Sequence, residues 1–264
     1  MSEILIERNG SQLRLILNRP NSGNAIDLPM AKLMLQAAIA AEADPSVRCV
    51  VLTGRGRYFC VGGDILDFIA AGVKIQGYLK ELTTYLHAAI IRLLKMEKPL
   101  VVAVNGPAAG GGMGLALLGD SVIASRSSHF SATYTAIGLT PDCGLSWTLP
   151  KLVGLRRAQQ LLVRNQRVSA DEAASIGLIS DVVEDDLLGS AINDQVDQLA
   201  GLPTLALGSV RNLLLSSFTA SLESQLELES RTIAEHAATD AGREGIAAFI
   251  EKRKPDYKKL EAQI

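Results

Sequence analysis

Little in this 264-residue chain suits binding to nucleic acid or membranes. Its 26 Lys and Arg and 28 Asp and Glu are interspersed and leave a net charge of −2, so no basic surface is expected. Aromatic residues make up only 4% of the chain, and glycines or Asp120 interrupt the apolar runs well before bilayer length. The N-terminus, MSEILIERNG, lacks the apolar run of a signal peptide. We expect a cytoplasmic protein that contacts neither nucleic acid nor membrane.

Cysteine and histidine are also scarce. The chain has three of each, and Cys49, Cys60 and Cys143 lie far apart. This spacing gives neither a disulfide framework nor a metal-ligand motif, so we expect no metal site. The run GRGRYFCVGG has the glycines of a phosphate-binding loop but lacks the Lys-Ser/Thr pair that would follow them.

The chain does contain alternating β-branched runs and helical stripes. Asn9-Gly10 between two apolar runs predicts a hairpin, and Val47–Thr53 predicts a strand buried on both faces of a parallel sheet. Further strands are expected at Leu100–Val104, Ser121–Ala124 and Asp181–Val183, and helices at Tyr78–Met96 and Leu155–Val163. After Val183 the pattern is helical, at Leu187–Leu199, Leu205–Leu214, Leu222–His236 and Arg243–Ile250. We therefore expect an α/β core followed by a helical region for packing or oligomerisation.

Two glycine-rich turns follow two of the predicted buried strands. One reads GRGRYFCVGGDI and comes after Val47–Thr53, and the other, NGPAAGGGMG, comes after Leu100–Val104. Glycines leave backbone N–H groups bare, and a helix beginning at such a turn directs its first N–H groups toward a ligand. Two such turns can converge on one oxygen atom, which is what a two-donor oxyanion hole requires.

Several ordered motifs resemble one known family. FCVGGDI, KPLVVAVNGPAAGGGMGLALLGD, IGLTPDCG, LVGLRRA, SADEAASIGLISDVV and EGIAAFIEKRKPDY span most of the chain and together resemble the crotonase superfamily of enoyl-CoA hydratases and isomerases. The resemblance implies a spiral of ββα units over residues 1–183, holding the CoA and acyl site, and a helical trimerisation region over 184–264. It implies an acyl-CoA thioester as substrate, with no separate cofactor, and homotrimers or dimers of trimers.

The same resemblance assigns roles to particular residues. The N–H groups of Val61 and Gly111 would hold an enolate oxygen. Tyr257 and Lys258 fall in a tail that often contributes to nucleotide binding in a neighbouring subunit. The positions expected to contact CoA or the acyl group are Ser22, Ala25, Gly63, Asp64, Ile65, Tyr134 and Pro141.

Departures from the family pattern indicate the chemistry. Hydratases of the family activate water with two glutamates, and here those positions are Gly114 and Tyr134, neither of which can act as a carboxylate base. Asp142 matches the position of the proton-shuttling acid of several isomerases. As a single base it would move a proton from the α to the γ carbon and convert a 3-enoyl-CoA into a 2-enoyl-CoA. Ile137, Leu139 and Trp147 are expected to bury it.

Two alternatives remain open. In 4-halobenzoyl-CoA dehalogenases of the family, an aspartate at the position of Asp142 is the nucleophile and a histidine at the position of His87 assists hydrolysis. Those enzymes have tryptophan where this chain has Tyr134, and His87 is equally consistent with an ordinary helix residue. The other alternative is a thioester-binding scaffold without activity. Cys143 is expected to be a small wall residue.

Overall fold

The computed structural model describes residues 2–257 and has a six-stranded main sheet with the strand order β1-β2-β3-β4-β6-β9. Only β1 and β2 pair antiparallel, through the predicted hairpin, and the other neighbours are parallel. The bounds are β1 Ile4–Asn9, β2 Gln12–Leu17, β3 Cys49–Gly54, β4 Leu100–Val104, β6 Ser121–Ser125 and β9 Asp181–Val183. The predicted strands are thus confirmed, most within one or two residues.

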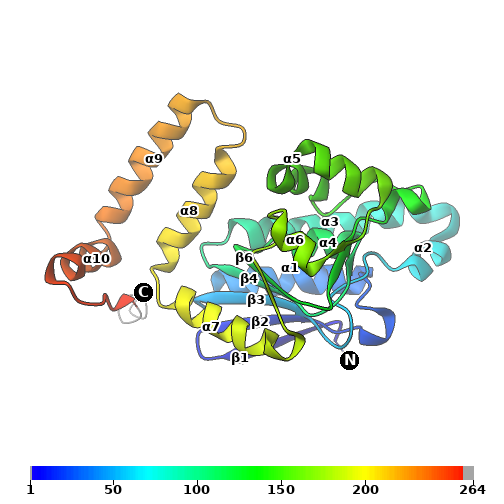
Figure 1. Ribbon diagram of the computed structural model, residues 1–264, viewed down its shortest axis with the longest axis horizontal. Helices are drawn as coiled ribbons and strands as arrows, with labels where there is room; N and C mark the ends of the chain where they lie inside the picture. The colour runs from blue at the N-terminus through cyan, green and yellow to red at the C-terminus, as the bar shows by residue number, and fades with distance from the viewer. Residues whose placement is uncertain (1, 258–264) are drawn as a thin grey trace.

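Helices cover both faces of this sheet (Figure 1). One face carries α1 (Leu28–Ala43), which Asp27 caps by accepting from the Met30 N–H, together with α3 (Ile75–Lys95) and α4 (Gly111–Ala116). The other face carries α7 (Leu188–Ala200). Successive residues of β3 alternate between the two cores, as the strand's continuous apolar run predicts.

A second, three-stranded sheet lies beside the glycine turns. It consists of β5 (Ala108–Ala109), β7 (His129–Ser131) and β8 (Val168–Ser169). The short helix α6 (Ala170–Ser175) follows β8 directly, and Ser169 caps it by accepting the Glu172 N–H. Another short helix, α2 (Ile65–Ala71), follows the glycine-rich turn after β3. The helix α5 (Leu145–Arg164) begins ten residues before the helix expected at Leu155–Val163 and is broken at Gly154. The sequence did not predict the first part of α5, because this part contains Pro150 and its apolar residues do not recur at helical spacing.

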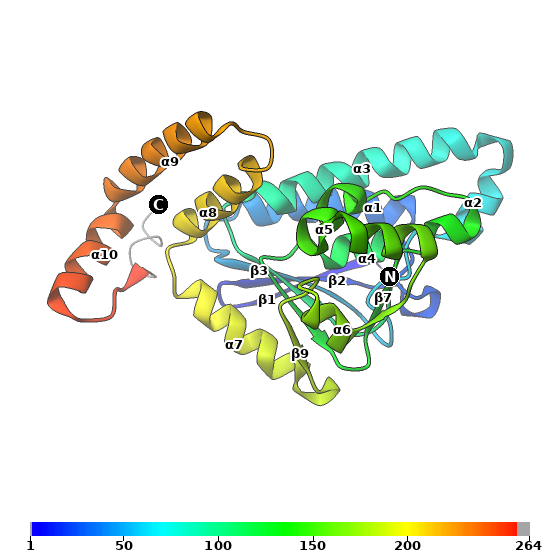
Figure 2. The ribbon, with the colours of Figure 1, turned by 45° about the horizontal axis from the view of Figure 1, so that its top comes forward.

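The last three helices form an arm that projects from the body (Figures 1 and 2). They are α8 (Thr204–Ser216), α9 (Leu222–Ala237) and α10 (Asp240–Glu251). The sequence analysis placed the start of the helical region at residue 184. In the structure α7 packs on the main sheet, and the projecting arm begins after α7. The architecture is therefore mixed α/β with a helical C-terminal region, as the sequence predicts.

Arg211 ties α8 to the core. Its buried guanidinium donates to the carbonyl oxygens of Leu93 at 3.0 Å, Met96 at 3.1 Å and Lys98 at 2.7 Å, and it pairs with both oxygens of Asp120. The charge is therefore compensated by a carboxylate and by the last carbonyls of α3.

No single helix within residues 2–257 is both long and apolar enough to span a membrane. The segments Asp185–Ala200 and Thr204–Ser216 meet the length and composition criteria only when they are taken together, and the two are bent by 99° relative to each other.

Candidate active site

The two glycine-rich turns meet, as the sequence predicts. Cys60 pairs with Ala108 in a parallel bridge, and the Ala109 N–H donates to the Cys60 carbonyl oxygen at 2.9 Å. Gly112 permits this approach, because a Cβ atom there would lie 2.1 Å from that same oxygen. The close contact brings the start of α4 against the turn that follows β3.

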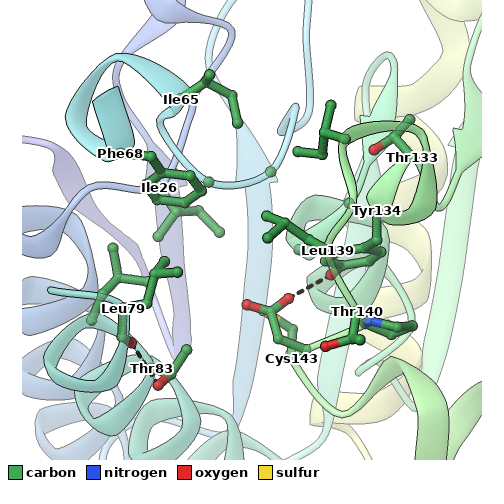
Figure 3. A pocket seen from close by; sticks show the side chains of 18 of the residues that line it. Ile26, Ile65, Phe68, Leu79, Thr83, Thr133, Tyr134, Leu139, Thr140 and Cys143 are labelled. Carbon is green, nitrogen blue, oxygen red and sulfur yellow. Dashed lines mark hydrogen bonds between the residues drawn. The ribbon is translucent and has the colours of Figure 1, made fainter. Parts of the chain in front are cut away.

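A cavity of about 390 Å³ opens where the turns meet. Figure 3 shows Ile26, Ile65, Phe68, Leu79 and Thr83 on one side and Thr133, Tyr134, Leu139 and Thr140 on the other. Among the described residues that line the cavity, Asp142 alone is charged, and most of the others are apolar or glycine. Such a cavity suits a neutral, apolar acyl group.

The backbone donors at the cavity differ from the predicted pair. The Val61 N–H donates to the Gly23 carbonyl oxygen at 3.0 Å, so the prediction that Val61 supplies an oxyanion donor is wrong. Gly63 instead presents an N–H with no acceptor among residues 2–257. Its neighbours Gly62 and Asp64 bond to Ile26, which turns the Gly63 N–H to the opposite side. The sequence could not show which of the Val61 and Gly63 N–H groups is free, because Gly23, whose carbonyl oxygen accepts the Val61 N–H, lies far away in the chain.

Gly111 also lines the cavity, and its N atom would lie 3.4 Å from a Cβ atom on Gly62. It is the first residue of α4, and the first N–H groups of a helix have no acceptor within the helix. A Cβ atom at Gly111 would lie 3.5 Å from Asp142 Oδ1. The backbone at Gly111 and the carboxylate of Asp142 therefore face the same space.

Asp142 is bonded to Tyr134. The Tyr134 hydroxyl donates to Asp142 Oδ1 at 2.5 Å, and Figure 3 draws this bond. Tyr134 is buried, and this burial, together with the neighbouring charge of Asp142, raises the pKa of its hydroxyl far above the usual value. Its hydroxyl therefore remains a donor throughout the working pH range of a protein. Tyr134 lines the cavity, as predicted, but its bond to Asp142 could not be anticipated from the sequence.

His87 reaches the same turn from α3. Its Nε2 accepts the Cys143 backbone N–H at 3.2 Å, and its ring nitrogen, the Asp142 carboxylate and the Cys143 thiol lie within 4.8 Å of one another. Cys143 has a left-handed backbone with φ of 52°, which is costly for a residue with a side chain. The bond from His87 helps to hold that conformation.

The sequence did not predict that His87, Asp142 and Cys143 come together, and no metal site was expected there. Burial raises the pKa of the Cys143 thiol well above its usual value, with the charge of Asp142 adding to the effect. The thiol is therefore protonated at ordinary pH. Cys143 is a buried wall residue beside Asp142, as predicted.

The structure separates the expected contact residues into two groups. Gly63, Ile65, Tyr134 and Pro141 line the cavity. Ser22 is exposed and Ala25 is buried nearby in the chain, and neither lines it.

Asp64 has a structural role. Its carboxylate accepts the Leu66 N–H at 3.0 Å, at the start of α2, and pairs with Arg19 at 2.8 Å. In the arm, Tyr257 lines a separate pocket with Gly245 and His236. Lys258 lies outside the described residues.

Trp147 does not bury Asp142, so that prediction is wrong. Its ring packs edge-on against Phe218, with centroids 5.7 Å apart, and Lys151 Nζ lies 3.4 Å from its centroid. Ile137 and Leu139 do line the cavity with Asp142. Because α5 begins at Leu145, Trp147 lies in the first turn of this helix, where its side chain contacts Phe218.

The comparisons with known proteins agree with this fold and site. The model of the enoyl-CoA hydratase/isomerase family matches residues 7–260. A 1,2-epoxyphenylacetyl-CoA isomerase of Escherichia coli is 37% identical, over 97% of this chain and 98% of the relative. A 4-chlorobenzoyl coenzyme A dehalogenase of Arthrobacter is 32% identical, over 94% and 91%. A crystal structure of an enoyl-CoA hydratase from Polaromonas has a TM-score of 0.91 and 32% identity, covering 96% and 98%.

The chain therefore belongs to the enoyl-CoA hydratase/isomerase family and is an enzyme of that family, for which acyl-CoA thioesters are consistent substrates. The three relatives are named for three different reactions. The reaction of this chain must be argued from its own site.

Proposed function

We propose that the protein is an acyl-CoA isomerase that shifts the double bond of a 3-enoyl-CoA into conjugation with the thioester. The observation that carries the proposal is the placement of Asp142, the charged residue of an otherwise uncharged cavity, 3.5 Å from where a Cβ of Gly111 would lie. A carboxylate that lines the same cavity as a backbone donor can remove a proton next to a carbonyl whose oxygen the donor holds.

The proposed reaction uses one base. Asp142 takes the proton from the α carbon, and the electron pair of that C–H bond forms a thioester enolate. The N–H groups of Gly63 and Gly111 stabilise the enolate oxygen. Asp142 then returns the proton to the γ carbon, which restores the thioester carbonyl and leaves the double bond between the α and β carbons. Coenzyme A is part of the substrate, and the step needs no further cofactor.

Hydration is disfavoured by what occupies the two glutamate positions of the hydratases. Gly114 packs against Cys143, and the Tyr134 hydroxyl is committed to Asp142. Asp142 therefore has no second carboxylate with which to bind and deprotonate water.

Turnover of 3-hexenoyl-CoA tests the proposal, followed by the absorbance of the conjugated thioester and by exchange of α protons in heavy water. Asp142→Asn is expected to lower kcat by about 10²- to 10⁴-fold. Asp194→Asn, on the exposed face of α7, is the matched control and leaves kcat unchanged. Isomerisation at the normal rate by Asp142→Asn would refute the mechanism.

The second candidate is hydrolysis of a halogenated aromatic acyl-CoA, and the proximity of His87 to Asp142 favours it. It predicts halide release from 4-chlorobenzoyl-CoA and a covalent Asp142 adduct detectable by mass. Against it stand the bond of His87 to the Cys143 N–H and that of Tyr134 to Asp142. A scaffold without activity would bind CoA but show no α-proton exchange.

Trimers or dimers of trimers belong to the same proposal. The arm exposes large apolar side chains that a neighbouring subunit would cover, at Leu222, Leu226, Ile233, Phe249 and Ile250. Light scattering of the purified protein gives the subunit number.

A further inference from the structure

Asp142 is held from two directions. On one side the Tyr134 hydroxyl donates to Oδ1, and on the other His87 accepts the N–H of Cys143, the next residue in the chain. Tyr134 itself is fixed at the start of a short 3-10 helix, where its N–H donates to the Ala132 carbonyl oxygen at 2.9 Å and its carbonyl oxygen accepts the Leu139 N–H at 3.0 Å. The backbone of Tyr134 is therefore held in place, and its buried ring carries the hydroxyl to Asp142 Oδ1.

We propose that Tyr134 is a positioning residue for the reaction: its hydroxyl fixes the rotation of the Asp142 carboxylate, so that Oδ1 is occupied and Oδ2 carries the proton. This inference rests on the isomerase function proposed above. In the first step the α C–H bond breaks and an O–H bond forms at Oδ2. In the second step that O–H bond breaks and a C–H bond forms at the γ carbon. One oxygen held in place can reach both carbons without a rotation between the steps.

The side chains around Asp142 leave Tyr134 as its hydroxyl donor. Within residues 2–257 the neighbouring titratable groups are Tyr134, His87 of α3, and the thiols of Cys60 and Cys143. Burial raises the pKa of both thiols and of the tyrosine hydroxyl, so these three are neutral at ordinary pH.

Tyr134→Phe removes the hydroxyl and keeps the buried ring. We expect kcat for 3-hexenoyl-CoA to fall by about 10- to 100-fold with little change in KM. Tyr85→Phe is the matched control, because Tyr85 lies on α3 outside the cavity lining, with its ring centroid 4.9 Å from Lys32 Nζ. It should leave kcat unchanged.

A second variant keeps the test valid if Tyr134→Phe folds poorly. Replacing Tyr134 with 3-fluorotyrosine retains the hydroxyl as a donor, so kcat should stay close to wild type. A loss of kcat in Tyr134→Phe and its retention in the 3-fluorotyrosine protein together support a role of the hydroxyl through Asp142. An unchanged kcat in Tyr134→Phe, or the same loss in Tyr85→Phe, would overturn the inference.

The infrared band of the Asp142 carboxylate separates this inference from the proposed function. The band, assigned by its loss in Asp142→Asn, should shift in Tyr134→Phe whether or not substrate turns over. If the wild-type protein neither isomerises 3-hexenoyl-CoA nor exchanges α protons, the proposed function is wrong. If the band does not shift, the positioning role is wrong.

Discussion

Gly114 and Cys143 lie so close that a Cβ atom on Gly114 would be 2.6 Å from the Cβ of Cys143 and 3.1 Å from its carbonyl oxygen. Cys143 directly follows Asp142 in the chain. Any side chain at residue 114 must therefore displace the segment that carries the candidate base.

This contact predicts that Gly114→Glu does not create a hydratase. The glutamate would push the Asp142 segment away instead of completing a pair, and even Gly114→Ala should lower the free energy of unfolding by about 1–3 kcal/mol. Urea unfolding and hydration of crotonyl-CoA measure the two effects. Gly77→Ala is the control, because Gly77 lies in α3 with nothing within 4 Å of its added Cβ. Hydration by a stably folded Gly114→Glu would contradict the prediction.

Backbone ester substitution tests the donor assignment. Glycolic acid in place of Gly63 removes only the N–H, and kcat should fall by about 10²- to 10³-fold, as for loss of one oxyanion donor. The matching ester at Val61 removes the bond to the Gly23 carbonyl oxygen. It should lower stability but leave kcat close to wild type. The reverse pattern would return the donor role to Val61.

The cavity should discriminate against acyl groups with a terminal carboxylate. No Lys or Arg among residues 2–257 lines the cavity, so a second carboxylate entering it would find no cationic partner there and would lie next to Asp142. We expect kcat/KM for 3-hexenoyl-CoA to exceed that for its ω-carboxylated analogue by at least about 100-fold. Thr83→Arg adds a cation to the wall and should narrow the difference. Equal turnover of both substrates by the wild-type enzyme would be incompatible with this view of the cavity.

Alkaline pH should destabilise the fold through its buried thiols. Burial raises the pKa of Cys60 from 9.0 to about 12. Between these values the unfolded chain releases the thiol proton and the folded chain retains it, so stability falls as pH rises, by about 1.4 kcal/mol per pH unit for each such thiol. Cys49 has the same shift for the same cause. Urea unfolding at pH 8 and pH 10.5 measures the loss, and Cys60→Ala should make it smaller.

The sheet and most helices follow from local sequence patterns. Asn9-Gly10 fixes the hairpin, the β-branched run ending at Thr53 fixes a strand buried on both faces, and Ser169 begins α6. In each case neighbours in sequence are also neighbours in space. The same holds for the meeting of the glycine turns, since adjacent parallel strands end at the same edge of a sheet.

The site was less accessible to sequence reasoning, because its decisive contacts join distant elements. The Val61 N–H is taken by the Gly23 carbonyl oxygen, and the orientation of Trp147 depends on where α5 begins. Tyr134 and Asp142 are eight residues apart, in a segment without a repeating period, and only the folded loop brings them together. The position of Asp142 was anticipated, but the residues that hold it were not.

Arg211 makes the C-terminal arm part of the scaffold that holds His87. Its guanidinium binds the last carbonyls of α3, and His87 lies two turns earlier on that helix, with Nε2 on the turn that follows Asp142. A truncation before α8 would therefore do more than remove a surface for neighbouring subunits. It would also free the C-terminal end of α3, the helix from which His87 contacts the turn that follows Asp142. Loss of the arm is therefore expected to loosen the position of Asp142 in the cavity.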